Sequence, residues 1–319
     1  MVKYLLFGNP EIMSAKAAWG IIDSGGLIKE IWLPKKTSTL NMIADRIIGI
    51  FQPKWSLHAA KKKSNSAFKF IPPFSKKNQT PPKECDRLIV SSFPYKIPKS
   101  FYEQFKQGAY NIHPSLLPAY KGAHPLFWMI YNDRCNLYGG ITVHKISEDF
   151  DTGEIITQTP LPLGDKTLRK WQIALAKLSH YLIKDCIFNN FTPMEKTKFN
   201  GFQESYFPPI GPGQLKIEDP NKINNFKKKM NLLDQIYPFY LTTNKGENKK
   251  IILKQTIENT GNIRENAGII KEEITSNTFR LKMGKGFVVF KEKTRIFELV
   301  EKISYFFSLV FDFKSEKRK

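Results

Sequence analysis

The segment from residue 111 to residue 125, NIHPSLLPAYKGAHP, holds an amide and an imidazole that could act together on one substrate. Asn111 and His113 stand two residues apart at the end of an apolar run, so both project from the same face of a predicted strand. Pro114 follows directly, and because proline cannot donate to a sheet ladder, the strand must end there. The pattern therefore predicts an amide and an imidazole side by side at a strand end.

A second polar segment lies about forty residues further on. The sequence SEDFDTGEII, residues 147–156, is an acidic turn between two predicted strands, and GAHP, residues 122–125, is a tight turn into a helix. Ligands of parallel α/β sheets bind at the carboxyl ends of the strands. If the acidic turn folds back onto the first segment, it brings the carboxylate of Asp151 to His113.

These three side chains suit acyl transfer to an amine supplied by the substrate, with no Ser or Cys nucleophile. Asn111 could donate a hydrogen bond to the oxyanion, and one such donor contributes about 3–4 kcal/mol to transition-state stabilisation. His113 could stabilise the same charge or move the amine proton. Asp151 could orient His113 and raise its pKa. His144, in the middle of a predicted strand, is expected to be structural.

The motifs NIHPSLLPAYKG and GGITVHKISEDFDTGEII together resemble the formyltransferases that use 10-formyltetrahydrofolate. The resemblance extends over residues 1–190 and implies that Asn111, His113 and Asp151 form a catalytic trio. It also implies a folate site, with 10-formyltetrahydrofolate as cosubstrate and no metal. The residues implied to line it are Ser115, Leu116, Leu117 and Pro118, with the loop residues Tyr95, Ile97 and Pro98.

Two branches of that family share features with this chain. The opening LFGNPEIM, the total length and a small module after a Pro-rich linker resemble the methionyl-tRNA formyltransferases. However, LPKKTSTLNMIADR replaces the Gly/Arg-rich loop of that branch, and AYKGAHP replaces its Arg-Trp-Arg-Gly-Ala-Ala-Pro. HPLFWMIYND instead resembles formyltransferases whose substrate is a nucleotide-linked amino sugar. A hydrolase that releases formate from 10-formyltetrahydrofolate is a further alternative.

The elements that would position these residues follow a βαβ order. Short apolar runs predict strands, and apolar residues at helical spacing predict helices between them. We expect strands at 2–7, 27–33, 68–71, 87–92, 110–113, 140–146 and 154–159, and helices at 11–23, 41–51, 98–108, 122–131 and 167–190. This order predicts an α/β fold with a central, mostly parallel, Rossmann-like sheet. No GxGxxG motif supports a dinucleotide site.

A change of composition predicts a second domain. Proline and glycine become dense in YFPPIGPGQ, which indicates a linker at 206–220 between a catalytic domain, 1–205, and a C-terminal domain, 221–319. The C-terminal domain has several strand-like runs and is expected to be β-rich and barrel-like, either binding nucleic acid or sugar or serving as a packing module. An apolar helix is expected at 296–313, for packing or as an interfacial anchor.

Composition gives the setting. The formal net charge is +21, from 50 basic and 29 acidic residues, which fits tRNA phosphates or simply a lysine-rich surface. The three cysteines form no CxxC pair, so neither a disulfide framework nor a zinc site is expected, and a reducing, cytoplasmic location fits. No signal peptide or membrane-spanning stretch is evident, and the sequence does not fix an oligomeric state.

Overall fold

The computed structural model of the chain describes residues 1–164, 166–193 and 202–210, together with five strands between residues 239 and 292. The chain divides into two compact units, the first of which contains residues 1–208. The three cysteines are free and buried. Among the helices that the structure describes, none is both long and apolar enough to cross a membrane.

The first unit is built around a seven-stranded sheet in the order β3-β2-β1-β4-β5-β7-β8. The first five strands of this order run parallel, and β7 and β8 are antiparallel to their neighbours. The predicted mostly parallel α/β sheet is therefore confirmed. The strands are β1 (Lys3–Phe7), β2 (Leu27–Pro34), β3 (Ala67–Ile71), β4 (Arg87–Ser91), β5 (Ala109–His113), β7 (Gly140–Lys145) and β8 (Ile155–Pro160).

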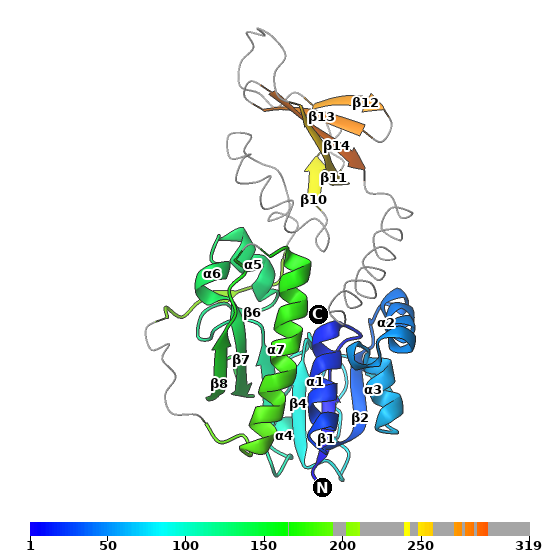
Figure 1. The fold of residues 1–319 in the computed structure, drawn as a ribbon, viewed down its shortest axis with the longest axis vertical. Helices are drawn as coiled ribbons and strands as arrows, with labels where there is room; N and C mark the ends of the chain where they lie inside the picture. The colour runs from blue at the N-terminus through cyan, green and yellow to red at the C-terminus, as the bar shows by residue number, and fades with distance from the viewer. Residues whose placement is uncertain are drawn as a thin grey trace, which may run out of the picture. The chain divides into compact units, whose positions relative to one another are not determined.

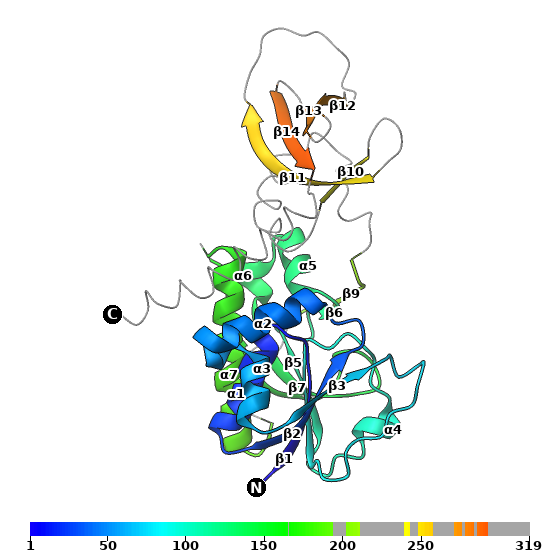
Figure 2. The ribbon, with the colours of Figure 1, turned by 90° about the vertical axis from the view of Figure 1, so that its right-hand side faces the viewer.

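Helices cover both faces of this sheet. Figure 2 shows α1, α2, α3 and α7 on one side of the strands and α4 on the other. Figure 1 shows α5 and α6 at the end of the unit opposite to the N-terminus. The helices are α1 (Ile12–Asp23), α2 (Thr39–Phe51), the 3-10 helix η1 (Pro53–Trp55), α3 (Leu57–Lys63), α4 (Lys99–Tyr102), α5 (Pro125–Tyr131), α6 (Cys135–Tyr138) and α7 (Leu168–Phe188).

Burial explains why the central strands carry apolar side chains on both faces. All five residues of β4 are buried, as expected of a parallel strand with helices on both sides. On the α4 side, Phe7 packs against Trp32 and Phe101 in one aromatic cluster. On the other side, α1 packs along α7, which Thr167 caps by accepting a hydrogen bond from the Lys170 N–H at 3.3 Å. This core holds the strand ends in fixed positions.

Two predicted helices differ from the structure. The helix expected at 98–108 spans only Lys99–Tyr102, and the helix expected at 122–131 begins at Pro125. In front of it, Lys121–Gly122 forms a short strand, β6, which pairs with β9 (Tyr206–Phe207). Gly122 has a φ of +94°, which is incompatible with a helix. No local pattern predicts this pairing, because its partner strand lies more than eighty residues away.

The described strands of the second unit form an antiparallel sheet in the order β10-β11-β14-β13-β12. A β-rich, barrel-like C-terminal domain stays a prediction, as do the domain boundaries. Most of the predicted linker and the whole of the predicted apolar helix 296–313 lie outside the described residues. The strands are β10 (Phe239–Thr242), β11 (Asn248–Ile257), β12 (Lys271–Thr275), β13 (Thr278–Met283) and β14 (Gly286–Glu292).

Candidate active site

Asn111 and His113 lie at the carboxyl end of β5, between β4 and β7. In the antiparallel pairing of β5 with β7, Asn111 is opposite His144 and His113 is opposite Thr142. Residues directly opposite each other in such a pair have neighbouring side chains on the same face. The sheet register therefore adds a second histidine to the predicted pair.

The turn between β7 and β8 carries Asp151 back to these side chains, as predicted. Asp151 has a φ of +55°, a backbone region that non-glycine residues seldom occupy and that is frequent at functional sites. The turn also depends on Gly153, because a Cβ atom there would lie 1.9 Å from the carbonyl oxygen of Lys145. The Asp-Thr-Gly sequence is thus the local requirement for folding the turn back onto the strand.

Four groups surround the carboxylate of Asp151. Its Oδ2 accepts a hydrogen bond from the Gly122 N–H at 2.8 Å and lies 3.5 Å from His113 Nδ1. Its Oδ1 accepts a hydrogen bond from Asn111 Nδ2 at 3.1 Å and lies 3.4 Å from His144 Nε2. The structure therefore brings the three predicted catalytic residues into one buried cluster.

Electrostatics keeps the Asp151 carboxylate ionised. Burial opposes the charge, but His113, His144 and the hydrogen bond from Gly122 outweigh it and hold the pKa of Asp151 well below its usual range. The cluster thus holds a fixed negative charge beside two imidazole rings.

His113 is held between two hydrogen-bond acceptors. Its Nε2–H donates to the carbonyl oxygen of Tyr120 at 2.8 Å, and its Nδ1 faces the Asp151 carboxylate. Burial lowers the pKa of His113 below 6.5 and outweighs the opposing effects of Asp151 and the Tyr120 carbonyl. Asp151 does act to raise this pKa, as predicted, but burial has the larger effect and the net shift is downward. A neutral imidazole is able to take up a proton.

The Asn111 amide nitrogen also has two partners. Its Nδ2 donates to Asp151 and lies 3.2 Å from His144 Nε2, while His144 Nδ1–H donates to the carbonyl oxygen of Lys145 at 2.8 Å. That last bond leaves Nε2 of a neutral His144 as an acceptor for Asn111. To donate to a substrate oxyanion, Asn111 must release one of these two contacts.

The predicted folate-lining residues after β5 are mostly buried. The side chains of Ser115, Leu116 and Leu117 are inaccessible to solvent, and Pro118 is half-buried. Ser115 Oγ donates to the carbonyl oxygen of Ala119 at 2.8 Å. These three side chains therefore shape the loop from inside, and only backbone groups and Pro118 remain to face a ligand.

Two residues missed in the sequence fix this loop. Thr142 Oγ1 donates to the Ser115 carbonyl oxygen at 2.7 Å and accepts from the Leu117 N–H at 3.1 Å. Gln158 Nε2 donates to the Leu117 carbonyl oxygen at 2.7 Å and to Thr142 Oγ1 at 2.9 Å. A fully hydrogen-bonded buried network of this kind holds the backbone in one conformation.

The second predicted folate loop follows β4, the strand beside β5. Ile97 is buried in the aromatic cluster around Phe7, Pro98 is half-buried, and the half-buried Tyr95 packs edge-on against Phe93 with ring centroids 5.2 Å apart. Phe93 and Ile146, the residue just before the acidic turn, both pack against this cluster. The β4 loop and the segment leading into the acidic turn therefore pack on the same aromatic cluster. The role of Tyr95, Ile97 and Pro98 in folate binding stays a prediction.

The short β6–β9 ladder forms the other side of the site. The Phe207 ring stacks on Tyr120, with centroids 4.7 Å apart, and on Trp128, with centroids 5.1 Å apart. The Trp128 indole N–H donates to the carbonyl oxygen of Pro208 at 3.0 Å. Lys121 is buried and forms an ion pair with Glu204. This aromatic stack fixes Gly122, and with it the N–H that holds Asp151.

Comparison with known proteins finds similarity in the region that carries these residues. Residues 70–185 match the family model described as formyl transferase. A methionyl-tRNA formyltransferase from Prochlorococcus marinus is 31% identical over 178 residues, which cover 53% of this chain and 52% of that protein. A GDP-perosamine N-formyltransferase from Brucella melitensis is 40% identical over 73 residues, 23% of this chain and 27% of that protein. The chain spans about half the length, or less, of these relatives.

A solved structure shares the fold over most of the chain. The sugar 3N-formyl transferase WlaRD, solved in the presence of dTDP and 5-N-formyl-THF, aligns with a TM-score of 0.54 at 21% identity. The alignment covers 92% of this chain and 97% of that one.

Proposed function

We propose that this chain, whose residues 70–185 match the formyl transferase family model, transfers a formyl group from 10-formyltetrahydrofolate to a primary amine. The observation that carries this proposal is the buried cluster in which Asp151 Oδ1 accepts from Asn111 and Oδ2 faces His113. An amide donor, a neutral imidazole and a fixed carboxylate are the groups that such a transfer needs.

Each side chain has a distinct role in the proposed reaction. The acceptor amine attacks the formyl carbon, and Asn111 donates to the oxygen that becomes negatively charged. His113 takes up the proton that the amine loses. This proton then passes to N10 of the folate as the bond between the formyl carbon and N10 breaks. Asp151 touches both residues, so it orients them and stabilises the imidazolium form of His113. No step requires a nucleophile from the protein.

The acceptor that we propose first is initiator methionyl-tRNA, at its amino group. Support comes from the methionyl-tRNA formyltransferase similar over 178 residues and from the net charge of +21, which suits an RNA partner. A nucleotide-linked amino sugar is the second candidate, favoured by the similarity to the Brucella N-formyltransferase. The proposed setting is the cytoplasm, where the first of these acceptors is made.

The experiment is release of tetrahydrofolate from 10-formyltetrahydrofolate with three inputs: initiator methionyl-tRNA, a panel of nucleotide-linked amino sugars, and no acceptor. We expect release with the tRNA alone. Release with an amino sugar alone would favour the nucleotide-linked amino sugar as the acceptor. Release without any acceptor would indicate a hydrolase. No release in any mixture would overturn the proposed transfer.

A further inference from the structure

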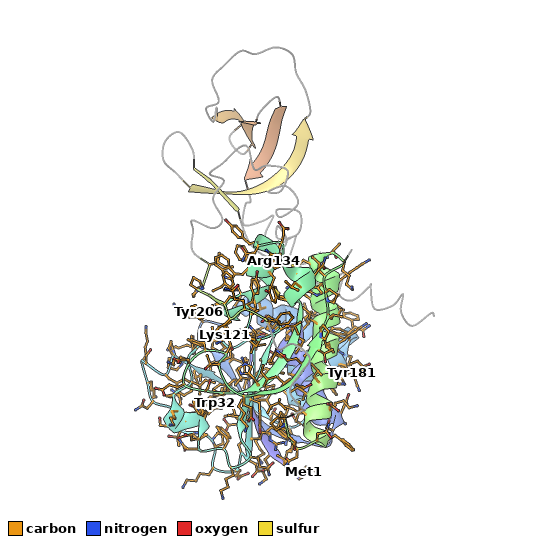
Figure 3. The ribbon with its side chains drawn as sticks, turned by 90° about the vertical axis from the view of Figure 1, so that its left-hand side faces the viewer. Met1, Trp32, Lys121, Arg134, Tyr181 and Tyr206 are labelled. Carbon is orange, nitrogen blue, oxygen red and sulfur yellow. The ribbon has the colours of Figure 1, made fainter. Side chains whose placement is uncertain are left out.

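Tyr206 is the exposed residue of β9, the strand that pairs with β6 beside the active site. In the parallel register Lys121 pairs with Tyr206 and Gly122 with Phe207. The Lys121 N–H donates to the Ser205 carbonyl oxygen at 2.9 Å, and the Ala123 N–H donates to that of Phe207 at 3.3 Å. Figure 3 shows the labelled Tyr206 and Lys121 side chains close together. The backbone of β9 is therefore tied to the segment that holds Asp151.

The two residues of β9 face opposite ways. Phe207 is stacked on Tyr120 and Trp128, so alternation along the strand directs the Tyr206 side chain outward. Tyr206 is 57% exposed, and within the part of the chain that the structure describes its ring stacks on no other aromatic ring. The Phe207 ring anchors the strand, and the Tyr206 ring presents an accessible aromatic surface.

This surface lies next to the catalytic carboxylate. A Cβ atom on Gly122 would come within 2.9 Å of Tyr206 Cε2, so the ring rests against the glycine. The N–H of the same glycine donates to Asp151 Oδ2 at 2.8 Å. A single residue thus separates the exposed ring from the cluster in which the acceptor amine would react.

We infer that the Tyr206 ring is the stacking surface for the nucleobase of the acceptor. This inference rests on the proposed function, because both acceptors considered above carry a nucleobase. Stacking on an aromatic ring suits any base, since every base has a π-face. The ring is also pre-organised, because the Phe207 stack and the hydrogen bond from Trp128 to Pro208 fix the strand before a ligand arrives.

The experiment compares Tyr206→Ala with Tyr206→Phe in the full chain. Loss of one base–aromatic stack predicts a rise of roughly 5- to 100-fold in the acceptor KM of Tyr206→Ala, whereas Tyr206→Phe stays near the wild type. The Kd for tetrahydrofolate stays unchanged in both, which also reports that the fold is intact. Tyr181→Ala is the matched control, because Tyr181 is an exposed tyrosine on α7.

Direct binding separates the two sources of the nucleobase. Adenosine monophosphate and dTDP are titrated calorimetrically into the wild type, Tyr206→Ala and Tyr181→Ala. Weaker binding to Tyr206→Ala alone supports the inference, and the preferred nucleotide indicates a tRNA end or a nucleotide sugar.

Formyl transfer with an unchanged acceptor KM in Tyr206→Ala would overturn the inference while the proposed function stands. A weakened tetrahydrofolate Kd in Tyr206→Ala would assign the ring to the folate instead. Absence of transfer to every acceptor would reject the proposed function independently of nucleotide binding.

Discussion

The cluster around Asp151 and the β6–β9 ladder meet at Gly122 but differ in how far their polar and aromatic groups are satisfied. Both carboxylate oxygens of Asp151 and the amide nitrogen of Asn111 have partners within the protein. In the ladder, Phe207 is half-buried in the aromatic stack and the neighbouring Tyr206 is exposed. The first region is complete without a ligand, and the second has an open face.

This difference separates the reaction from the choice of substrate. The cluster consists of side chains from strand ends and one turn, and these side chains contact each other. It is therefore suited to the formyl transfer step, which is the same for every acceptor. The ladder joins β6 to a strand more than eighty residues later, so its exposed face depends on a segment outside the predicted catalytic motifs. We therefore expect substitutions in the cluster to change turnover and substitutions on the ladder to change acceptor binding.

The largest expected effect comes from removing the amide of the cluster. Asn111→Ala lowers kcat by about 10²–10³-fold, the usual loss when one oxyanion donor is removed. The acceptor KM changes little, because the ladder is untouched. Steady-state kinetics measures both parameters, with Glu148→Ala as a control in the exposed part of the acidic turn. Retention of full kcat would remove Asn111 from the mechanism.

The next largest effect couples the two regions. Gly122→Ala places a Cβ atom 2.3 Å from the Phe207 carbonyl oxygen, at a φ of +94°. We expect a loss of about 1–3 kcal/mol in the free energy of unfolding and changes in both kcat and acceptor KM. Gly25 has a φ of +78° but no neighbour within 4 Å, so Gly25→Ala should leave both kinetic parameters unchanged. Denaturant unfolding and steady-state kinetics are measured on both variants. Equal changes of kcat and acceptor KM in Gly122→Ala and Gly25→Ala would contradict the coupling of the two regions through Gly122.

A smaller effect is expected from the network under the loop after β5. Thr142→Val removes the acceptor for the Leu117 N–H and the donor to the Ser115 carbonyl, all of them buried. The expected loss of stability is about 1–2 kcal/mol, with a weaker Kd for tetrahydrofolate. The control is Thr159→Val, on the half-exposed part of β8. If Thr142→Val binds tetrahydrofolate as the wild type does, this loop does not contribute to the folate site.

The smallest expected effect is a shift in the titration of His113. Burial lowers its pKa below 6.5 and Asp151 acts against burial, so Asp151→Asn should lower the pKa further. Because neutral His113 is the form favoured in the folded protein, its contribution to stability is present above pH 6.5 and is lost as the pH falls through the folded pKa. NMR titration of the imidazole resonances follows this directly, with His113→Gln for assignment. An upward shift in Asp151→Asn would contradict the proposed electrostatics.

Much of the fold could be predicted because its signals are local. Short apolar runs alternate with segments of helical periodicity, and this pattern predicts the order of strands and helices. The same pattern predicts that Asn111 and His113 lie at a strand end. Asp151 could be predicted from its turn, whose glycine is required by the close approach of the Lys145 carbonyl.

The missed residues have signals that are not local. His144 reaches the site through the register of β5 and β7, and Thr142 and Gln158 act on a loop that is distant in sequence. The β6–β9 pairing joins segments that no periodicity connects. The local signal in this segment is the pair of aromatic residues at 206–207, which lies at the start of the predicted linker.

The most direct test of the central claim is the transfer of a labelled formyl group from 10-formyltetrahydrofolate to initiator methionyl-tRNA by the full chain, run beside Asn111→Ala. We predict labelled formylmethionyl-tRNA from the wild type, formed about 10²–10³-fold more slowly by the variant. Equal rates for the two proteins, or no label on this acceptor or on any amino sugar, would contradict the account.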